Sequence, residues 1–220
     1  MRRPLAVFAG TAALLYAARR YYRNWGTTKH ECRQRLPGDE LIRPPLVRTT
    51  EGVWIDRPAE TVWPWLVQMG HNRGGLYGRG GLQALLGLAR DSADRIHPQW
   101  QHLEPGDRVQ LAPPGWLGRP AGLVMTVAQV LDGEALVLRG SPPDMPWDSV
   151  ISFHVLARGP DKCRLLVRSR TALRRPGQVL VAELAGPVAA LLTRGLLLGI
   201  KHRAEAPSSA EEALVSAEKI

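Results

Sequence analysis

The stretch of residues 53–77 sets out a short strand, a sharp turn, a tryptophan-rich helix and a glycine loop with no spacer between them. Val53 and Ile55 alternate with outward-facing positions, as in a half-buried strand, and the ring of Pro58 fixes a φ suited to the first turn of a helix. Over residues 62–70, apolar side chains recur every three or four positions and form one face of a helix. This succession predicts a domain whose first strand leads directly into a helix.

This stretch and the segments after it contain short motifs in a fixed order. They are Ile55-Asp56-Arg57-Pro58, Val62-Trp63-Pro64-Trp65-Leu66, Arg73-Gly74-Gly75-Leu76-Tyr77, Asp94-Arg95-Ile96-His97-Pro98, Pro105-Gly106-Asp107 and Cys163-Arg164-Leu165-Leu166-Val167-Arg168-Ser169-Arg170. In this order and spacing they resemble the SRPBCC, or START-like, superfamily, which includes polyketide cyclases, and more narrowly a bacterial branch of it. The resemblance covers residues 46 to about 172. The branch has an aromatic-acidic pair after the tyrosine, where this chain reads Gly78-Arg79 instead.

The rest of the domain reads as strands separated by turns. The first strand is predicted over 46–55, a second short helix over 82–88, and further strands over 108–112, 122–130, 135–139, 147–157 and 163–171. This spacing predicts an antiparallel meander. The resemblance implies an α+β helix-grip fold, in which a curved antiparallel sheet wraps around a long C-terminal helix.

Residues 177–202 are expected to form that long helix. Its leucines recur at helical spacing, at Leu180, Leu184, Leu191 and Leu198. Because the segment is apolar almost all round, two readings stay open: a second membrane span, or a helix gripped by the sheet with these leucines buried. Glu183 and Arg194 interrupt the apolar sequence, and together with the resemblance they favour the gripped helix.

An N-terminal membrane-anchor helix is predicted over residues 4–18, which contain no charge and are bracketed by arginines and tyrosines. Such a helix covers about 22 Å, short of the roughly 30 Å hydrocarbon core, but flanking arginines can snorkel to the surface. A secretory signal and a peripheral extension are the alternatives, and the signal lacks a well-placed small-residue cleavage site. We expect the protein to be located at a membrane through this single anchor. The basic excess in residues 19–35 favours the orientation in which the domain faces the cytoplasm.

The charge distribution argues against a nucleic-acid partner. The formal net charge is +9, but residues 1–45 hold nine Arg and Lys against three Asp and Glu, which leaves only +3 for residues 46–220. The domain therefore lacks the concentrated basic face that phosphate binding requires. We expect an anchor and basic linker over 1–45, a START-like domain over 46–203 and a polar tail over 204–220.

No motif points to catalysis, a metal or a cofactor. The histidines are scattered without the spacing of metal ligands, and the two cysteines, at 32 and 163, exclude a disulfide framework. There is no Gly-x-Ser-x-Gly, and the glycine-rich residues 74–81 follow a helix, so they lack the context of a phosphate cradle.

Five residues are candidates for ligand contact. Tyr77 lies in the glycine loop, where it would mark a cavity mouth, and Trp65 and Trp147 offer large apolar area to a pocket or to the core. His154 shares the less hydrophobic face of its strand, which places it outside unless the faces are reversed. Arg168 belongs to a row of arginines on the last strand, either a solvated face or a contact for an acid group.

The resemblance implies a membrane-anchored binding protein whose partner is a small hydrophobic or amphipathic molecule or a lipid. Two alternatives stay open. One is a polyketide cyclase- or dehydratase-like enzyme that uses Tyr77, His154 and an arginine as an acid-base set. The other is a membrane-tethered interaction domain whose cavity is filled by side chains.

Overall fold

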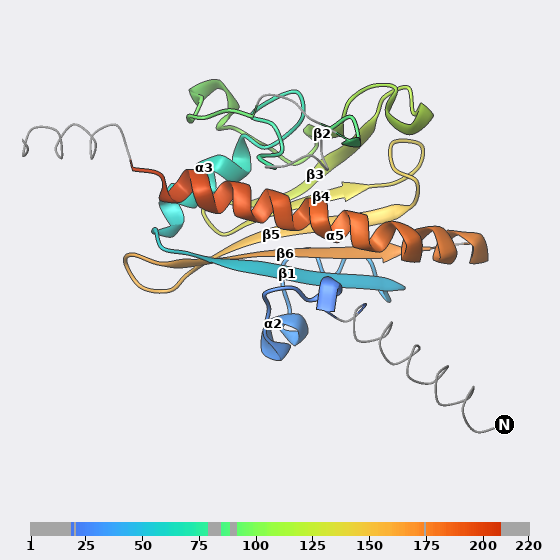
Figure 1. The fold of residues 1–220 in the computed structure, drawn as a ribbon, viewed down its shortest axis with the longest axis horizontal. Helices are drawn as coiled ribbons and strands as arrows, with labels where there is room; N and C mark the ends of the chain where they lie inside the picture. The colour runs from blue at the N-terminus through green and yellow to red at the C-terminus, as the bar shows by residue number, and fades with distance from the viewer. Residues whose placement is uncertain (1–18, 20, 79–84, 89–91, 174, 208–220) are drawn as a thin grey trace, which may run out of the picture.

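The computed structural model describes residues 19, 21–78, 85–88, 92–173 and 175–207 (Figure 1). The predicted anchor over residues 4–18 lies outside the described residues, as do residues 82–84 of the second predicted helix and the tail beyond 207.

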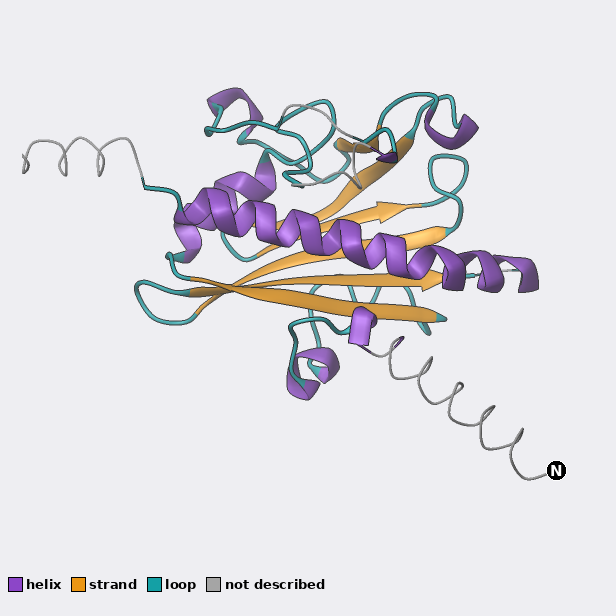
Figure 2. Ribbon diagram, in the orientation of Figure 1, coloured by secondary structure: helices purple, strands orange, loops and turns teal. Residues whose placement is uncertain are grey.

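Within the described part of the chain, six antiparallel strands form one sheet in the order β1-β6-β5-β4-β3-β2 (Figure 1). Figure 2 shows these strands in orange, with the long helix crossing in front of them. The strands are Val47–Ile55 (β1), Arg108–Ala112 (β2), Leu123–Leu131 (β3), Ala135–Gly140 (β4), Asp148–Ala157 (β5) and Cys163–Ala172 (β6). Strands β2 to β6 follow one another as the predicted meander. The last strand, β6, pairs with the first, so Val47 lies opposite Thr171 and Ile55 lies opposite Cys163.

The helices are Lys29–Arg33 (α2), Ala59–Val67 (α3) and Pro176–Glu205 (α5), with 3-10 turns at Pro98–Trp100 and Trp116–Gly118. As predicted, α3 follows β1 directly, with Pro58 at its N-cap. The 30-residue α5 lies across one face of the sheet (Figure 1), which gives the helix-grip arrangement.

The main core lies between α5, α3 and the sheet. Strand alternation turns Ile55, Phe153 and Leu165 toward the helix, and α5 contributes Leu197 and Ile200 from its second half. Each of these side chains is buried, so this part of the interior is filled by the protein itself.

The expected burial of Leu180, Leu184, Leu191 and Leu198 is wrong. These four leucines are between 44% and 72% exposed. The face of α5 that meets the sheet instead presents small residues in its first half, such as Ala182 and Ala190. Leucine spacing could not select the buried face because the helix is apolar nearly all round, and alanines allow the closer approach to the sheet.

Residues 21–45, expected as a linker, are packed against the domain. Residues 21–25 lie on the α5 side of β1, residues 25–27 run along its edge, and α2 with residues 34–42 covers the opposite face. Ile42, for example, packs on Val137 and Val150 of that face. The N-terminal segment therefore wraps around the β1 edge of the sheet.

Candidate functional site

A hollow of about 210 Å³ lies where α5, β1 and the N-terminal segment meet. Its walls are mostly apolar, and it is lined by Tyr21, Tyr22, Trp25, Glu51, Pro187, Ala190, Leu191 and Arg194. We call it the α5–β1 pocket. It lies between the sheet and the long helix, beside the part of the interior that the core side chains fill.

Strand alternation explains why β1 contributes an acid to this pocket. Glu51 lies on the same face of β1 as Val53 and Ile55, which belong to the main core. At this level α5 presents Ala190 rather than a large side chain, so the space above Glu51 stays open.

The aromatic wall of the pocket consists of Tyr21, Tyr22 and Trp25. Hydrogen bonds along the β1 edge hold it in place. The backbone N–H of Gly52 donates to the Trp25 carbonyl at 3.1 Å, and Thr27 Oγ1 donates to the Thr50 carbonyl at 3.0 Å. Gly26 lies so close to β1 that a Cβ at that position would be 2.2 Å from the Gly52 carbonyl oxygen, and its φ is +72°. Only glycine fits both constraints.

Ion pairs hold the other side of this wall to α5. Arg19 Nη2 and Arg23 Nη2 lie 2.6 and 2.7 Å from the same oxygen of Glu183. These arginines lower the pKa of the Glu183 carboxyl, chiefly through the hydrogen bond from Arg19. Residues 19 and 23 are therefore tied to the first half of α5.

The polar end of the pocket is Glu51, which is 2% exposed. Its Oε2 is buried and has no hydrogen-bond partner. Burial raises the pKa of Glu51 to about 8, although the nearby positive charge of Arg194 opposes part of that shift. The guanidinium of Arg194 lies 4.3 Å from the centre of the Trp25 ring. The site thus offers an apolar surface with one acid and one arginine.

A second hollow, of about 410 Å³, lies between α3, the loop at 101–104 and the end of β3. It is lined by Trp63, Val67, Gln101, His102, Leu103, Glu104, Val130 and Asp132. Its polar side chains come mainly from the exposed loop, and no group of three metal-ligating side chains occurs among the described residues. We therefore regard it as the weaker candidate.

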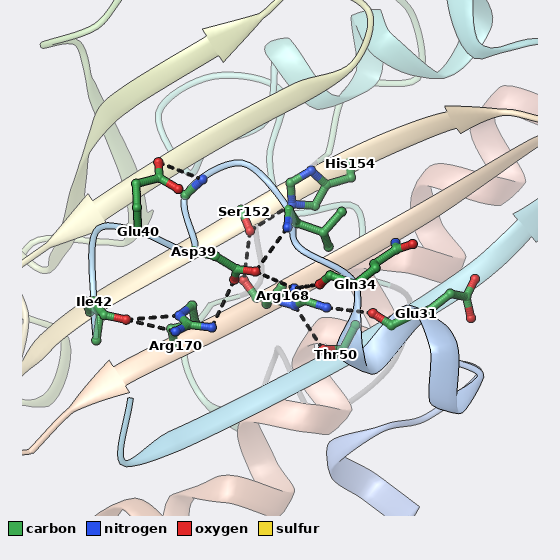
Figure 3. A network of polar contacts seen from close by, with 12 residues as sticks. Glu31, Gln34, Asp39, Glu40, Ile42, Thr50, Ser152, His154, Arg168 and Arg170 are labelled. Carbon is green, nitrogen blue, oxygen red and sulfur yellow. Dashed lines mark hydrogen bonds and ion pairs between the residues drawn. The ribbon is translucent and has the colours of Figure 1, made fainter. Parts of the chain in front are cut away.

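A buried polar network occupies the opposite face of the sheet, under the N-terminal segment (Figure 3). Asp39 accepts hydrogen bonds from Arg168 at 2.7 Å and from Arg170 at 3.0 Å. Arg168 also donates to the Glu31 and Gln34 carbonyls, at 2.6 and 2.9 Å. These contacts satisfy the guanidinium of Arg168 within the protein, so we read the network as the attachment of the segment to β6.

His154 lies beside this network, with Nε2 2.9 Å from Ser152 Oγ (Figure 3). Burial, and to a smaller extent the charge of Arg168, lowers the pKa of His154 to about 4. The imidazole is therefore neutral at physiological pH.

The structure does not bring the five predicted ligand contacts together. Trp65 and Tyr77 pack against each other in the main core, with ring centres 5.8 Å apart and the Tyr77 hydroxyl donating to the Trp65 carbonyl at 2.9 Å. His154 and Arg168 lie on the opposite face, and Trp147 is half-buried just before β5. None of the five lines the α5–β1 pocket, and ligand contact by any of them stays a prediction.

The expected position of Tyr77 at a cavity mouth needs correction. Tyr77 is fully buried, and a Cβ at Gly74 would be 2.8 Å from its hydroxyl oxygen. The absence of a side chain at Gly74 is explained by this close packing around Tyr77. Residues 79–81 of the loop lie outside the described part.

Sequence reasoning did not single out the residues of the α5–β1 pocket. One signal was present: Glu51 alternates in phase with Val53 and Ile55, which marks it as an acid on a buried face. The contribution of the aromatic residues at 21–25 had no such signal, because a basic, polar stretch after an apolar run reads as a linker.

Comparisons with known proteins concern the fold. No family model and no curated protein matches the sequence. Similar solved structures include a START superfamily protein from Mycobacterium smegmatis, with 15% identity, a TM-score of 0.43 and coverage of 70% of this chain and 97% of that one. CalU16 from Micromonospora echinospora has 15% identity and a TM-score of 0.43, with coverage of 77% and 82%.

A third similar structure is norcoclaurine synthase from Thalictrum flavum in complex with dopamine and hydroxybenzaldehyde. It has 17% identity, a TM-score of 0.43, and coverage of 74% of this chain and 89% of that one. In this chain, a strand and helix precede an antiparallel meander, and the long C-terminal helix then crosses the sheet. This arrangement is the helix-grip fold that the sequence resemblance implies. The agreement concerns the fold alone and says nothing about ligand or reaction.

Proposed function

We propose that this protein is a membrane-anchored binding protein that holds a small hydrophobic or amphipathic molecule in the α5–β1 pocket. The observation that carries the proposal is the pocket itself, an apolar hollow between the sheet and the long helix with a single buried acid at its end. Mostly apolar pockets with a few polar groups are typical small-molecule sites.

The extent of the pocket limits what it can hold. Side chains such as Phe153 and Leu197 fill the space under the second half of α5, and the hollow begins where Ala190 replaces a larger residue. We therefore expect one small molecule, or the end of a longer one, rather than a large ligand running the length of the sheet.

Two observations support attachment to a membrane. The uncharged residues 4–18 end at Arg19, which is paired with Glu183 of α5. Next to that pair, α5 exposes a row of apolar side chains, including Leu180 and Leu184. We propose that the anchor enters the bilayer there and that this row faces the membrane surface, with the domain on the cytoplasmic side.

Among the described helices, α5 is long and apolar enough to cross a membrane by length and composition. Its inner face, however, presents Leu197, Ile200 and Ala204 to the core of the sheet. A helix that crossed the bilayer would have to withdraw these residues from the core, so we propose that α5 stays on the domain and lies along the membrane surface.

We do not extend the proposal to catalysis. The acid-base set expected for a cyclase is divided between the two faces of the sheet, with Tyr77 in the main core and His154 beneath the N-terminal segment.

A substitution that fills the pocket should prevent a small molecule from binding there. Ala190 lines the pocket, whereas its neighbour Ala189 is exposed, so Ala190→Trp and Ala189→Trp form a matched pair. We expect native mass spectrometry of the purified full-length protein to show small apolar molecules on the wild type and on Ala189→Trp, but not on Ala190→Trp. Equal amounts of bound molecule on both variants, or no bound molecule on the wild type, would contradict the proposal.

The membrane part is tested separately by fractionation. The full-length chain should pellet with membranes and resist extraction by concentrated salt, because apolar insertion is not screened by ions. Release by salt alone would leave only an electrostatic attachment.

A further inference from the structure

We infer that Glu51 is the group in the α5–β1 pocket that recognises its ligand, and that it selects amphipathic molecules whose apolar body ends in a hydroxyl group. The inference rests on the proposed function and specifies the chemistry of the ligand.

Glu51 is a costly residue for the fold alone. Its carboxyl is almost fully buried, its Oε2 has no hydrogen-bond partner, and its neighbours in the pocket are mostly apolar. Burying such an oxygen without a partner is unfavourable, because it loses its hydrogen bonds to water and gains none in the protein. An apolar side chain at position 51 would avoid this cost, so packing does not explain the acid, whereas a polar group of a bound ligand does.

The protonation state of Glu51 defines what that polar group can be. With a pKa of about 8, the carboxyl is mainly protonated at pH 7. A protonated carboxyl both donates and accepts a hydrogen bond. A hydroxyl group also does both, so an alcohol can supply the partner that Oε2 lacks, whether that oxygen carries the proton or accepts one.

Arg194 disfavours a cationic ligand at the same place. It lines the pocket from α5, and it is the charged residue whose interaction with Glu51 lowers the pKa of that acid. The other titratable side chains that line the pocket are Tyr21 and Tyr22. An ammonium group would have to ionise Glu51 and lie near the Arg194 guanidinium, whereas a hydroxyl group requires neither change.

Three probes with one apolar body test the inference: 4-phenylbutan-1-ol, 4-phenylbutan-1-amine and butylbenzene. Binding to the full-length chain in lipid nanodiscs is followed by the NMR signal of the Trp25 indole, which lies in the pocket wall. The proteins are the wild type, Glu51→Gln and Glu51→Leu. Each probe partitions into the lipid to the same extent whichever protein is present. The ratio of the affinities of two proteins for one probe therefore reports binding in the pocket.

At pH 7 we expect the wild type to bind the alcohol about tenfold more tightly than butylbenzene, the value of one good buried hydrogen bond, and more tightly than the amine. Glu51→Gln, which keeps a donor and an acceptor, should retain most of this preference. Glu51→Leu should lose it while binding butylbenzene at least as well as the wild type.

Equal binding of alcohol and butylbenzene by the wild type, a preference for the amine, or a preference for the alcohol that survives Glu51→Leu would overturn the inference and leave the proposed function standing. No shift of the Trp25 signal with any probe would overturn both.

Discussion

Arg168 Nη1 lies 2.7 Å from Asp39 Oδ2, and this buried ion pair joins the last strand of the sheet to a segment 129 positions earlier in the chain. The other oxygen of the same carboxylate accepts from Arg170. One acid therefore compensates two buried guanidinium groups.

Removal of that acid should be strongly destabilising. Asp39→Ala leaves two buried arginines without their shared partner, and breaking a buried pair on one side costs about 3–5 kcal/mol. The control is Asp56→Ala, which removes an exposed partner of Lys162 and should cost far less, because solvent screens exposed ion pairs. Urea denaturation of both variants measures the difference, and similar losses would show that the Asp39 network does not hold the segment in place.

Glu51 should make the protein less stable as the pH rises. Its pKa in the folded state, about 8, lies above the usual 4.5, so the folded state holds the proton more tightly. This contribution is complete below pH 4.5 and is lost as the pH rises through 8, with a slope of at most about 1.4 kcal/mol per pH unit. Denaturation at pH 5, 6.5 and 8 should show the slope in the wild type and a flatter profile in Glu51→Gln. The exposed control Glu134→Gln should keep the wild-type slope.

His154 should make the protein less stable as the pH falls. Its folded pKa of about 4 lies below the usual 6.5, because burial disfavours the charged form. Its contribution is complete above pH 6.5 and is lost as the pH falls toward 4, since the unfolded chain takes up the proton first. His154→Gln should lose less stability than the wild type between pH 7 and 5, and the exposed His102→Gln should behave as the wild type does. If the His154 and His102 variants gave the same profile, His154 would not be buried as a neutral group.

The close approach of α5 to the sheet depends on Gly199. A Cβ there would lie 1.9 Å from the Tyr77 carbonyl oxygen, whereas at Gly195, one turn earlier, the nearest atom would be 3.9 Å away. Gly199→Ala should therefore destabilise the protein by at least about 1–3 kcal/mol through overpacking. Gly195→Ala should be neutral or stabilising by up to about 1 kcal/mol, as in an ordinary helix. Thermal melting of this pair measures how closely α5 must pack.

The strands and the first helix were predictable because their signals are local. Val53 and Ile55 alternate, Pro58 starts a helix, and turn residues separate the later strands, so the meander and the resemblance agreed. The buried face of α5 was not predictable, since leucines and alanines both suit an apolar helix and only packing against the sheet distinguishes them.

The candidate site was less predictable than the fold, for a physical reason. The pocket needs Trp25 from the N-terminal segment, Glu51 from β1 and Arg194 from α5, which only the folded chain brings together. The partners of Arg168 are likewise remote in sequence, so a row of arginines on a strand looked the same whether it was solvated or covered.

The bonds from Trp25 and Thr27 to β1 also affect how copies of the protein meet. β1 is an outer strand, and an uncovered outer strand offers its free amide and carbonyl groups to any similar strand nearby. Residues 25–27 occupy these groups at Gly52 and Thr50. We therefore expect a chain that begins after residue 27 to keep every strand but to expose this edge to pairing with the same edge of another copy, which the N-terminal segment prevents.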